Sequence, residues 1–135
     1  MAHFTVAYWC VLIAALLPIV CAGLAKRSAL GQSAQQGGFD NHHPRAWLSR
    51  QTGASARANA AQANTFEALP FFIGAVVIAH QLGAAQMPLD GLASLFVVLR
   101  VLYIVMYMAD LATARSVVWG AALLVNIGIL FLGYR

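Results

Sequence analysis

Four long runs of apolar residues constrain this chain more than any other feature. They cover about residues 4–24, 66–82, 92–109 and 117–132. Each run is close to the roughly 20 residues that a helix needs to cross a bilayer, although the second and fourth are short. Only 9% of the residues are charged, whereas soluble domains have about 25%. The sequence therefore predicts an all-α integral membrane protein in which residues 1–135 form a single domain, a four-helix transmembrane up-down bundle.

The second apolar run follows a stretch that favours helix outside the membrane. From Thr52 onward the sequence is rich in alanine, and no helix breaker occurs before Pro70. Because alanine has the highest helix propensity, we expect the second helix to start near Thr52 and to project from the membrane. We expect "GAAQMPLDG" to connect the second and third spans, and a short helix to start at Pro44.

The basic residues are concentrated in the long first loop, about residues 25–51. This loop has one acidic residue, Asp40, against four basic ones, Lys26, Arg27, Arg45 and Arg50. The connection between the second and third spans contains no Lys or Arg. By the positive-inside rule, the first loop is predicted to be cytoplasmic and both termini to lie outside.

Arg100 lies near the middle of the third apolar run, where a cation is costly. Insertion scales assign at least about 2.5 kcal/mol to an arginine at that depth. Tyr103 and Tyr107 follow at spacings of three and four residues, so they share a helix face with Arg100. The third span is therefore predicted to carry one polar face inside the membrane.

A second polar face is predicted on the preceding helix. Arg57, Asn64 and Glu67 are separated by seven and three residues, which places them on one side. A carboxylate just inside an apolar run needs a cation, a proton or water. We expect Glu67 to lie within hydrogen-bonding reach of Arg100, directly or through a ligand. The pair would then belong to a binding site, or it would be a buried ion pair that only fixes helix register.

Metal binding and nucleic-acid binding are not expected. The adjacent His42 and His43 have no third close ligand apart from Asp40, so we interpret "NHHPR" as a solvated turn. Basic residues interleaved with aromatic residues on a solvated surface are also missing from the sequence.

Two stretches resemble a known membrane family. "RANAAQANTFEALPFF" is similar to the second-helix signature of the MAPEG family, the membrane-associated proteins of eicosanoid and glutathione metabolism. "RVLYIVMYMADLATARSVVW" resembles the third helix and following turn of its eicosanoid-synthesising members, with Tyr103 in place of a histidine. The matching residues are Arg57, Asn64, Glu67, Pro70, Arg100, Tyr107, Arg115 and Ser116.

The resemblance implies a homotrimer that binds glutathione as a co-substrate between subunits and takes lipophilic substrates from the lipid bilayer. The implied activity is that of a glutathione-dependent transferase or peroxidase acting on lipophilic electrophiles or hydroperoxides. Arg115 and Ser116 are the implied catalytic residues, because a cation and a hydroxyl stabilise a thiolate. The implied glutathione-binding residues are Arg57, Asn64, Glu67, Arg100, Tyr103 and Tyr107.

Three positions depart from the family pattern. Ala60 stands where an arginine is common, Gln62 where a histidine is common, and Ala68 where some members have a tyrosine. Part of the usual contact with glutathione is therefore missing, which leaves a weaker affinity, a different thiol or a lost activity open. The alternative is a non-catalytic membrane protein that binds a lipid or a small acid in the same polar pocket.

Overall fold

The computed structural model describes residues 4–134, and it is built almost entirely from helices. The four long helices are α1 (Val6–Lys26), α3 (Gly53–Gln81), α4 (Gln86–Met108) and α5 (Ala112–Phe131). Each is long and apolar enough to cross a membrane. The loop after α1 holds the 3-10 turns η1 (Arg27–Ala29) and η2 (Ala34–Gln36) and the short helix α2 (Pro44–Ser49). No strand occurs within 4–134. The predicted fold class, an all-α membrane protein with a four-helix bundle, is confirmed.

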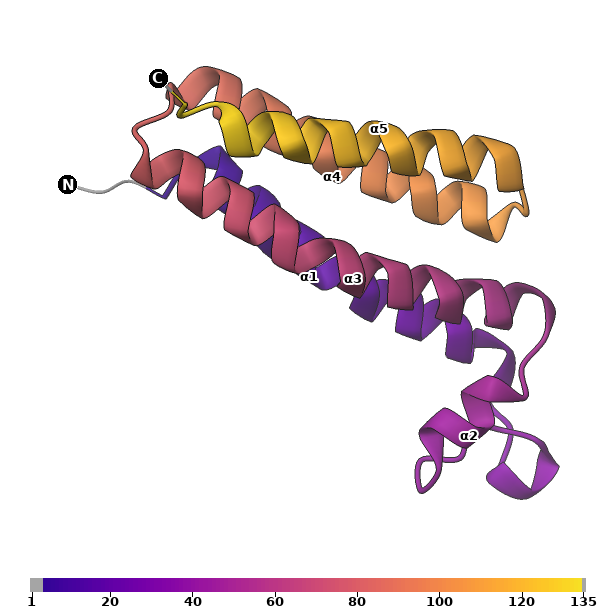
Figure 1. The fold of residues 1–135 in the computed structure, drawn as a ribbon. Coiled ribbons are helices and arrows are strands. Elements are labelled where there is room, and N and C mark those ends of the chain that lie inside the picture. The colour runs from indigo at the N-terminus through magenta and orange to yellow at the C-terminus, as the bar shows by residue number, and fades with distance from the viewer. Residues whose placement is uncertain (1–3, 135) are drawn as a thin grey trace.

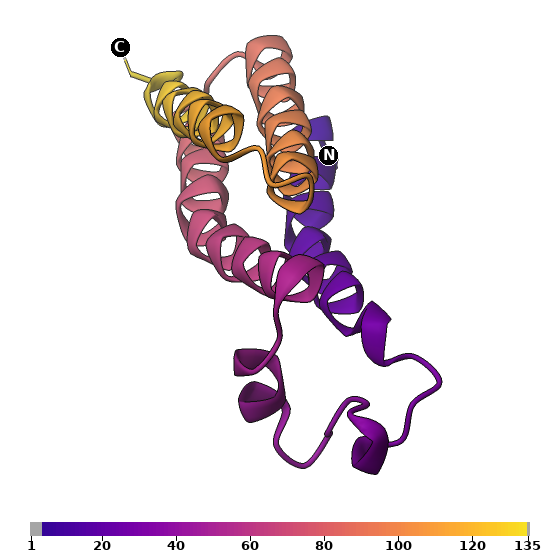
Figure 2. The ribbon, with the colours of Figure 1, turned by 90° about the vertical axis from the view of Figure 1, so that its right-hand side faces the viewer.

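The long helices are arranged as two antiparallel pairs, α1 with α3 and α4 with α5 (Figure 1). Both ends of the chain lie at one end of the bundle, and the loop that contains α2 projects from the other end (Figures 1 and 2). In Figure 1 the two pairs are closest near the chain ends and lie farther apart toward the loop. The buried residues of α1 and α3 are mostly small, and small residues allow close helix approach. They include Ala7, Ala14, Ala58, Ala61, Ala75 and Ala79.

The helix boundaries follow local sequence signals, with one exception. Thr52 is the N-cap of α3, and α2 begins at Pro44, as predicted. The expected connection from Gly83 to Gly91 is mostly helical instead, because α4 already begins at Gln86. Pro88 does not prevent this, since the first turn of a helix needs no N–H donor from it.

A group of residues joined by polar contacts, the terminal cluster, connects α1, α3 and α4 near the chain ends. It consists of Thr5, Ala7, Tyr8, His80 and Asp90. The Thr5 hydroxyl lies 3.2 Å from Nε2 of His80. The Tyr8 ring stacks on the His80 ring, with 4.4 Å between the ring centres. The backbone N–H of Ala7 donates to the Asp90 carboxylate at 2.8 Å. Asp90 therefore caps the first turn of α1 from another helix, where a negative charge also suits the helix dipole.

The first loop is anchored by one buried aromatic side chain, Trp47. Its indole Nε1 donates to the carbonyl of Gly37 at 3.3 Å, and its ring packs edge-on against Phe39 at 5.3 Å. The ammonium of Lys26 lies 4.0 Å from the centre of the Phe39 ring. The loop thus has a small core of its own at the end of α1.

The two loop histidines belong to a turn organised by Asp40. The backbone N–H groups of His42 and His43 donate to the Asp40 carboxylate at 2.9 and 3.3 Å. These hydrogen bonds, that of His42 foremost, hold the pKa of Asp40 below its ordinary value. In the part of the chain that the structure describes, no three His, Cys, Asp or Glu residues are placed to hold a metal ion.

Candidate functional site

Arg100 is the most buried charged residue of the bundle, and its side chain is only 2% exposed. Its Nη2 donates to Oδ1 of Asn64 at 3.1 Å and to the Thr65 hydroxyl at 2.9 Å. Its guanidinium carbon lies 4.3 Å from the centre of the Tyr103 ring. The salt bridges found within residues 4–134 involve other residues, so the contacts of this cation are to neutral groups.

Glu67 does not pair directly with Arg100, although the sequence analysis allowed for such a pair; a contact between them through a ligand stays a prediction. The Glu67 carboxylate is exposed, and it accepts a hydrogen bond from Nδ2 of Asn64 at 3.5 Å. An amide carries both an acceptor and a donor, so Asn64 binds the guanidinium with its oxygen and the carboxylate with its nitrogen. The physical reason is position: Asn64 lies one helical turn before Glu67 and occupies the space beside the guanidinium.

Two neighbouring tyrosines lie between two arginines along α4 and α5, in a row that we call the arginine–tyrosine ladder. It runs from Arg100 to Tyr103, Tyr107 and Arg115. The two tyrosine rings meet edge to face at 5.6 Å, and the guanidinium carbon of Arg115 lies 4.1 Å from the centre of the Tyr107 ring. The rings face the cations with their negative π-surfaces, but they carry no net charge. The ladder therefore presents two positive charges without a paired carboxylate from the described chain.

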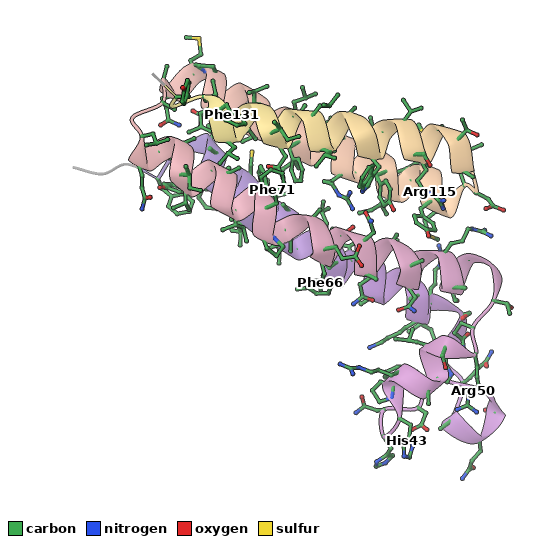
Figure 3. The ribbon with its side chains drawn as sticks, viewed as in Figure 1. His43, Arg50, Phe66, Phe71, Arg115 and Phe131 are labelled. Carbon is green, nitrogen blue, oxygen red and sulfur yellow. The ribbon has the colours of Figure 1, made fainter. Side chains whose placement is uncertain are left out.

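The ladder borders a cavity of about 200 Å³ toward the loop end, the tyrosine cavity. Its lining comes from α3, α4 and α5 and consists of Asn64, Tyr103, Tyr107, Arg115, Ser116 and Trp119. Figure 3 shows Arg115 near the loop end of α5, while His43 and Arg50 lie out on the loop. The Ser116 hydroxyl is exposed and donates to the carbonyl of Ala112 at 3.1 Å.

A second cavity of about 170 Å³, the central cavity, lies between the same three helices. It shares Asn64 and Trp119 with the tyrosine cavity, so the two are neighbours. In Figure 3, Phe71 lies between the helix pairs and lines this cavity, whereas the exposed Phe66 lies on the outer side of α3. Its remaining polar lining residues are Glu67, Arg100 and Asn126.

The structure thus brings most of the predicted site residues together, but not Arg57. Nε of Arg57 donates to the carbonyl of Met108 at 3.2 Å, at the end of α4, and its Nη1 lies 3.9 Å from the Asp110 carboxylate. Arg57 lines neither cavity and caps the C-terminus of α4. A role for Arg57 in glutathione binding stays a prediction.

Three residues of the site were missed by the sequence analysis: Thr65, Trp119 and Asn126. Helix periodicity does not predict Thr65 as a site residue, because Thr65 follows Asn64 directly in the chain. It contacts Arg100 only because α3 packs on α4. Asn126 had a signal, since a polar side chain within an apolar run is costly and needs a partner inside the bundle. Its spacing of eleven residues from Arg115, three helical turns, also places it on the side of α5 that carries Arg115.

Comparison with known proteins identifies one family. The model of the MAPEG family matches residues 6–134, which is nearly the whole chain. No curated protein and no solved structure matched the chain. The family match includes all four long helices and every residue that lines the two cavities.

Proposed function

We propose that this chain, which belongs to the MAPEG family, is a membrane-embedded glutathione-dependent transferase or peroxidase that acts on lipophilic electrophiles or hydroperoxides. One observation carries the proposal: the ladder holds two guanidinium groups, Arg100 and Arg115, and neither has a carboxylate partner among the described residues. A cation removed from water needs an opposite charge, and an anionic ligand supplies it. A bound thiolate with nearby carboxylates has the required charge.

Glutathione is complementary to the groups that line the two cavities. It carries two carboxylates, an ammonium, two peptide groups and a thiol. The fork of donors on Arg100 suits a carboxylate, and the exposed Glu67 suits the ammonium. Asn64, Tyr103 and Tyr107 offer hydrogen bonds to the peptide groups.

The proposed chemistry starts with the thiol. A free thiol has a pKa of about 8.5 and is only slightly ionised at neutral pH. Arg115, beside the tyrosine cavity, would stabilise the thiolate form, and the Ser116 hydroxyl would add to this once its proton turns from the Ala112 carbonyl to the sulfur. The thiolate sulfur then attacks an electrophilic carbon of the lipophilic substrate, a C–S bond forms, and the leaving group departs with its electron pair.

We extend the proposal to a homotrimer with its first loop in the cytoplasm. Neither cavity reaches the roughly 300 Å³ at which small-molecule pockets begin, so one subunit holds only part of the ligand. Exposed residues at the rim, among them Glu67 and Trp119, are available to a neighbouring subunit. The basic loop supports the cytoplasmic placement of the end where the tyrosine cavity lies.

The test is turnover by the purified full-length protein in detergent, with glutathione and either 1-chloro-2,4-dinitrobenzene or a fatty-acid hydroperoxide. Arg115→Ala should lower kcat about 100-fold, as expected when one charge-stabilising donor is removed, and should change glutathione binding much less. The control is Arg50→Ala, because Arg50 lies on the loop away from both cavities (Figure 3).

Arg115→Lys distinguishes two roles of Arg115. A guanidinium that is directed at the sulfur needs its fork of donors, whereas an anchor at the membrane boundary needs only a positive charge. If Arg115→Lys keeps full activity, Arg115 has no directed role at the sulfur. If the wild type shows no turnover with either substrate, the enzyme proposal is wrong.

The alternative is a non-catalytic protein that binds a lipid or a small acid in the same pocket. Ala68 favours it, because this residue lines the central cavity and offers no polar side-chain atom there. Binding of glutathione or of a small carboxylic acid without any turnover would support this reading.

A further inference from the structure

The short turn at residues 109–111 joins α4 to α5 and determines where α5 begins. The N–H of Leu111 donates to the carbonyl of Met106 at 3.0 Å, six residues being closed into one loop. Inside this loop, the N–H of Asp110 donates to the carbonyl of Tyr107 at 3.2 Å, which completes a Schellman motif. Leu111 is also the N-cap of α5, and its carbonyl accepts the N–H of Arg115 at 2.9 Å. The position of Arg115 therefore follows directly from that of the turn.

Asp110 adopts a backbone conformation that favours glycine. Its φ is 61°, and it is the one non-glycine residue of the described chain with a positive φ. Glycine is the usual residue at this position of the motif, because a side chain costs free energy there. The Asp110 carboxylate lies 3.9 Å from Nη1 of Arg57. An aspartate thus takes the place of the usual glycine where its carboxylate faces an arginine of α3.

Arg57 contacts this turn at two points. Besides facing Asp110, its Nε donates at 3.2 Å to the carbonyl of Met108, in the last turn of α4, where carbonyls lack helical partners. The Arg57 and Asp110 side chains are 30% and 74% exposed, and an exposed pair at this distance contributes little. The hydrogen bond to Met108 is the stronger contact, because a charged donor and the helix dipole both favour it.

We propose that Arg57 is a positioning residue for Arg115, and that it acts through the turn between α4 and α5. It holds the last turn of α4 against α3, and the Schellman motif carries this constraint to the first turn of α5. Tyr107 lies before the motif and Arg115 after it, so the 4.1 Å between the Arg115 guanidinium carbon and the Tyr107 ring centre depends on the turn. This role rests on the proposed function, in which Arg115 stabilises a thiolate beside the tyrosine cavity.

Amide hydrogen exchange of the purified full-length protein in detergent tests whether Arg57 holds the turn. Arg57→Met removes the donors and the charge but keeps a long side chain, and it should speed exchange in peptides that cover residues 109–116 about tenfold. The matched control is Arg50→Met, because Nε of Arg50 donates at 3.0 Å to the carbonyl of Ala46 within the loop. This control should leave the exchange of residues 109–116 unchanged.

Two further variants rank the contacts. Asp110→Asn removes the carboxylate but keeps a residue that tolerates a positive φ, so it should speed exchange less than Arg57→Met does. Arg57→Lys keeps the charge without the fork of donors and should also give a smaller increase, which keeps the test open if Arg57→Met folds poorly. Unchanged exchange in both folded variants of Arg57 would overturn the inference.

Glutathione-dependent turnover and the ultraviolet absorbance of the bound thiolate test whether the turn positions Arg115. Arg57→Met should reduce the thiolate absorbance and lower kcat about tenfold, with KM for glutathione within about twofold of the wild type, because a displaced group costs transition-state stabilisation. In an Arg115→Ala background, Arg57→Met should cause no further loss, since both substitutions remove the same interaction.

The outcomes distinguish a wrong role for Arg57 from a wrong function. A raised KM for glutathione with unchanged kcat would support the direct contact that the family resemblance implies, and additive losses in the double variant would show that Arg57 acts independently of Arg115. Either result overturns the inference, as does faster exchange with unchanged kcat and thiolate absorbance. If the wild type forms no thiolate and shows no turnover, the proposed function is wrong, and the exchange data still decide whether Arg57 holds the turn.

Discussion

The polar groups of the terminal cluster and those of the arginine–tyrosine ladder have different kinds of partner. In the terminal cluster, Thr5 and His80 lie within hydrogen-bonding distance of each other, and Asp90 accepts from the backbone of α1. Along the arginine–tyrosine ladder, two cations contact neutral rings and have no paired carboxylate among the described residues. The terminal cluster pairs its polar groups with partners on neighbouring helices, whereas the ladder holds two cations whose charge no described carboxylate neutralises.

The arrangement of the helices agrees with this difference. The two helix pairs are close together beside the terminal cluster and lie farther apart toward the loop (Figure 1). Arg57 and Arg100 also join α3 to α4 away from the terminal cluster, yet cavities remain there between α3, α4 and α5. Stability and ligand binding are therefore expected to respond to different residues.

The largest expected effect comes from Arg100→Met, which should weaken glutathione binding between about 10- and 100-fold, because a charge-assisted hydrogen bond contributes about 1.5–3 kcal/mol. The melting temperature should not fall, since methionine fills similar space without a buried charge. In this variant Thr65 keeps its hydrogen bond to the Ala61 carbonyl, and Asn64 keeps its hydrogen bond to the Glu67 carboxylate. Calorimetric binding and thermal unfolding in one detergent measure both quantities. A large loss of stability with intact binding would assign Arg100 to the scaffold.

Asp90→Ala should have a smaller effect, and this effect should be on stability rather than on glutathione affinity. The N–H of Ala7 loses its acceptor, which should cost about 1 kcal/mol of stability, as for other helix caps. Asp90→Asn keeps an acceptor oxygen and serves as the control. Glutathione affinity should be the same in all three proteins, and a change in affinity would show that the two ends are coupled.

The smallest effect is expected from labelling variants that report which end faces the cytoplasm. Gln35 is exposed on the loop, and Met87 is 86% exposed at the start of α4. With Gln35→Cys or Met87→Cys, an impermeant maleimide should label position 87 on intact cells and position 35 only after lysis. Cys10 and Cys21 are buried and should give little background. Labelling of position 35 from outside would invert the topology without changing the site.

Much of the fold follows from the sequence because hydrophobic runs and helix periodicity are local properties. The apolar runs predicted the four long helices, and the alanine-rich stretch after Thr52 predicted the extension of α3. Periodicity also placed Arg100, Tyr103 and Tyr107 on one face of α4, which is where the ladder lies. The helical start at Gln86 was missed, because Pro88 and two glycines resemble a connection although a proline is tolerated in a first helical turn.

The sequence alone determined the membrane-spanning helices, the basic loop and the helix faces that carry charge, because each depends on residues close together in the chain. Only the tertiary structure decided which groups meet. Asn64, rather than Glu67, contacts Arg100; Arg57 caps α4 instead of lining a cavity; and Asn126 on α5 lines the same cavity as Arg100 on α4. Periodicity defines a face on each helix, but the rotation and axial offset of one helix against another come from side-chain packing along their whole length, which no local pattern records.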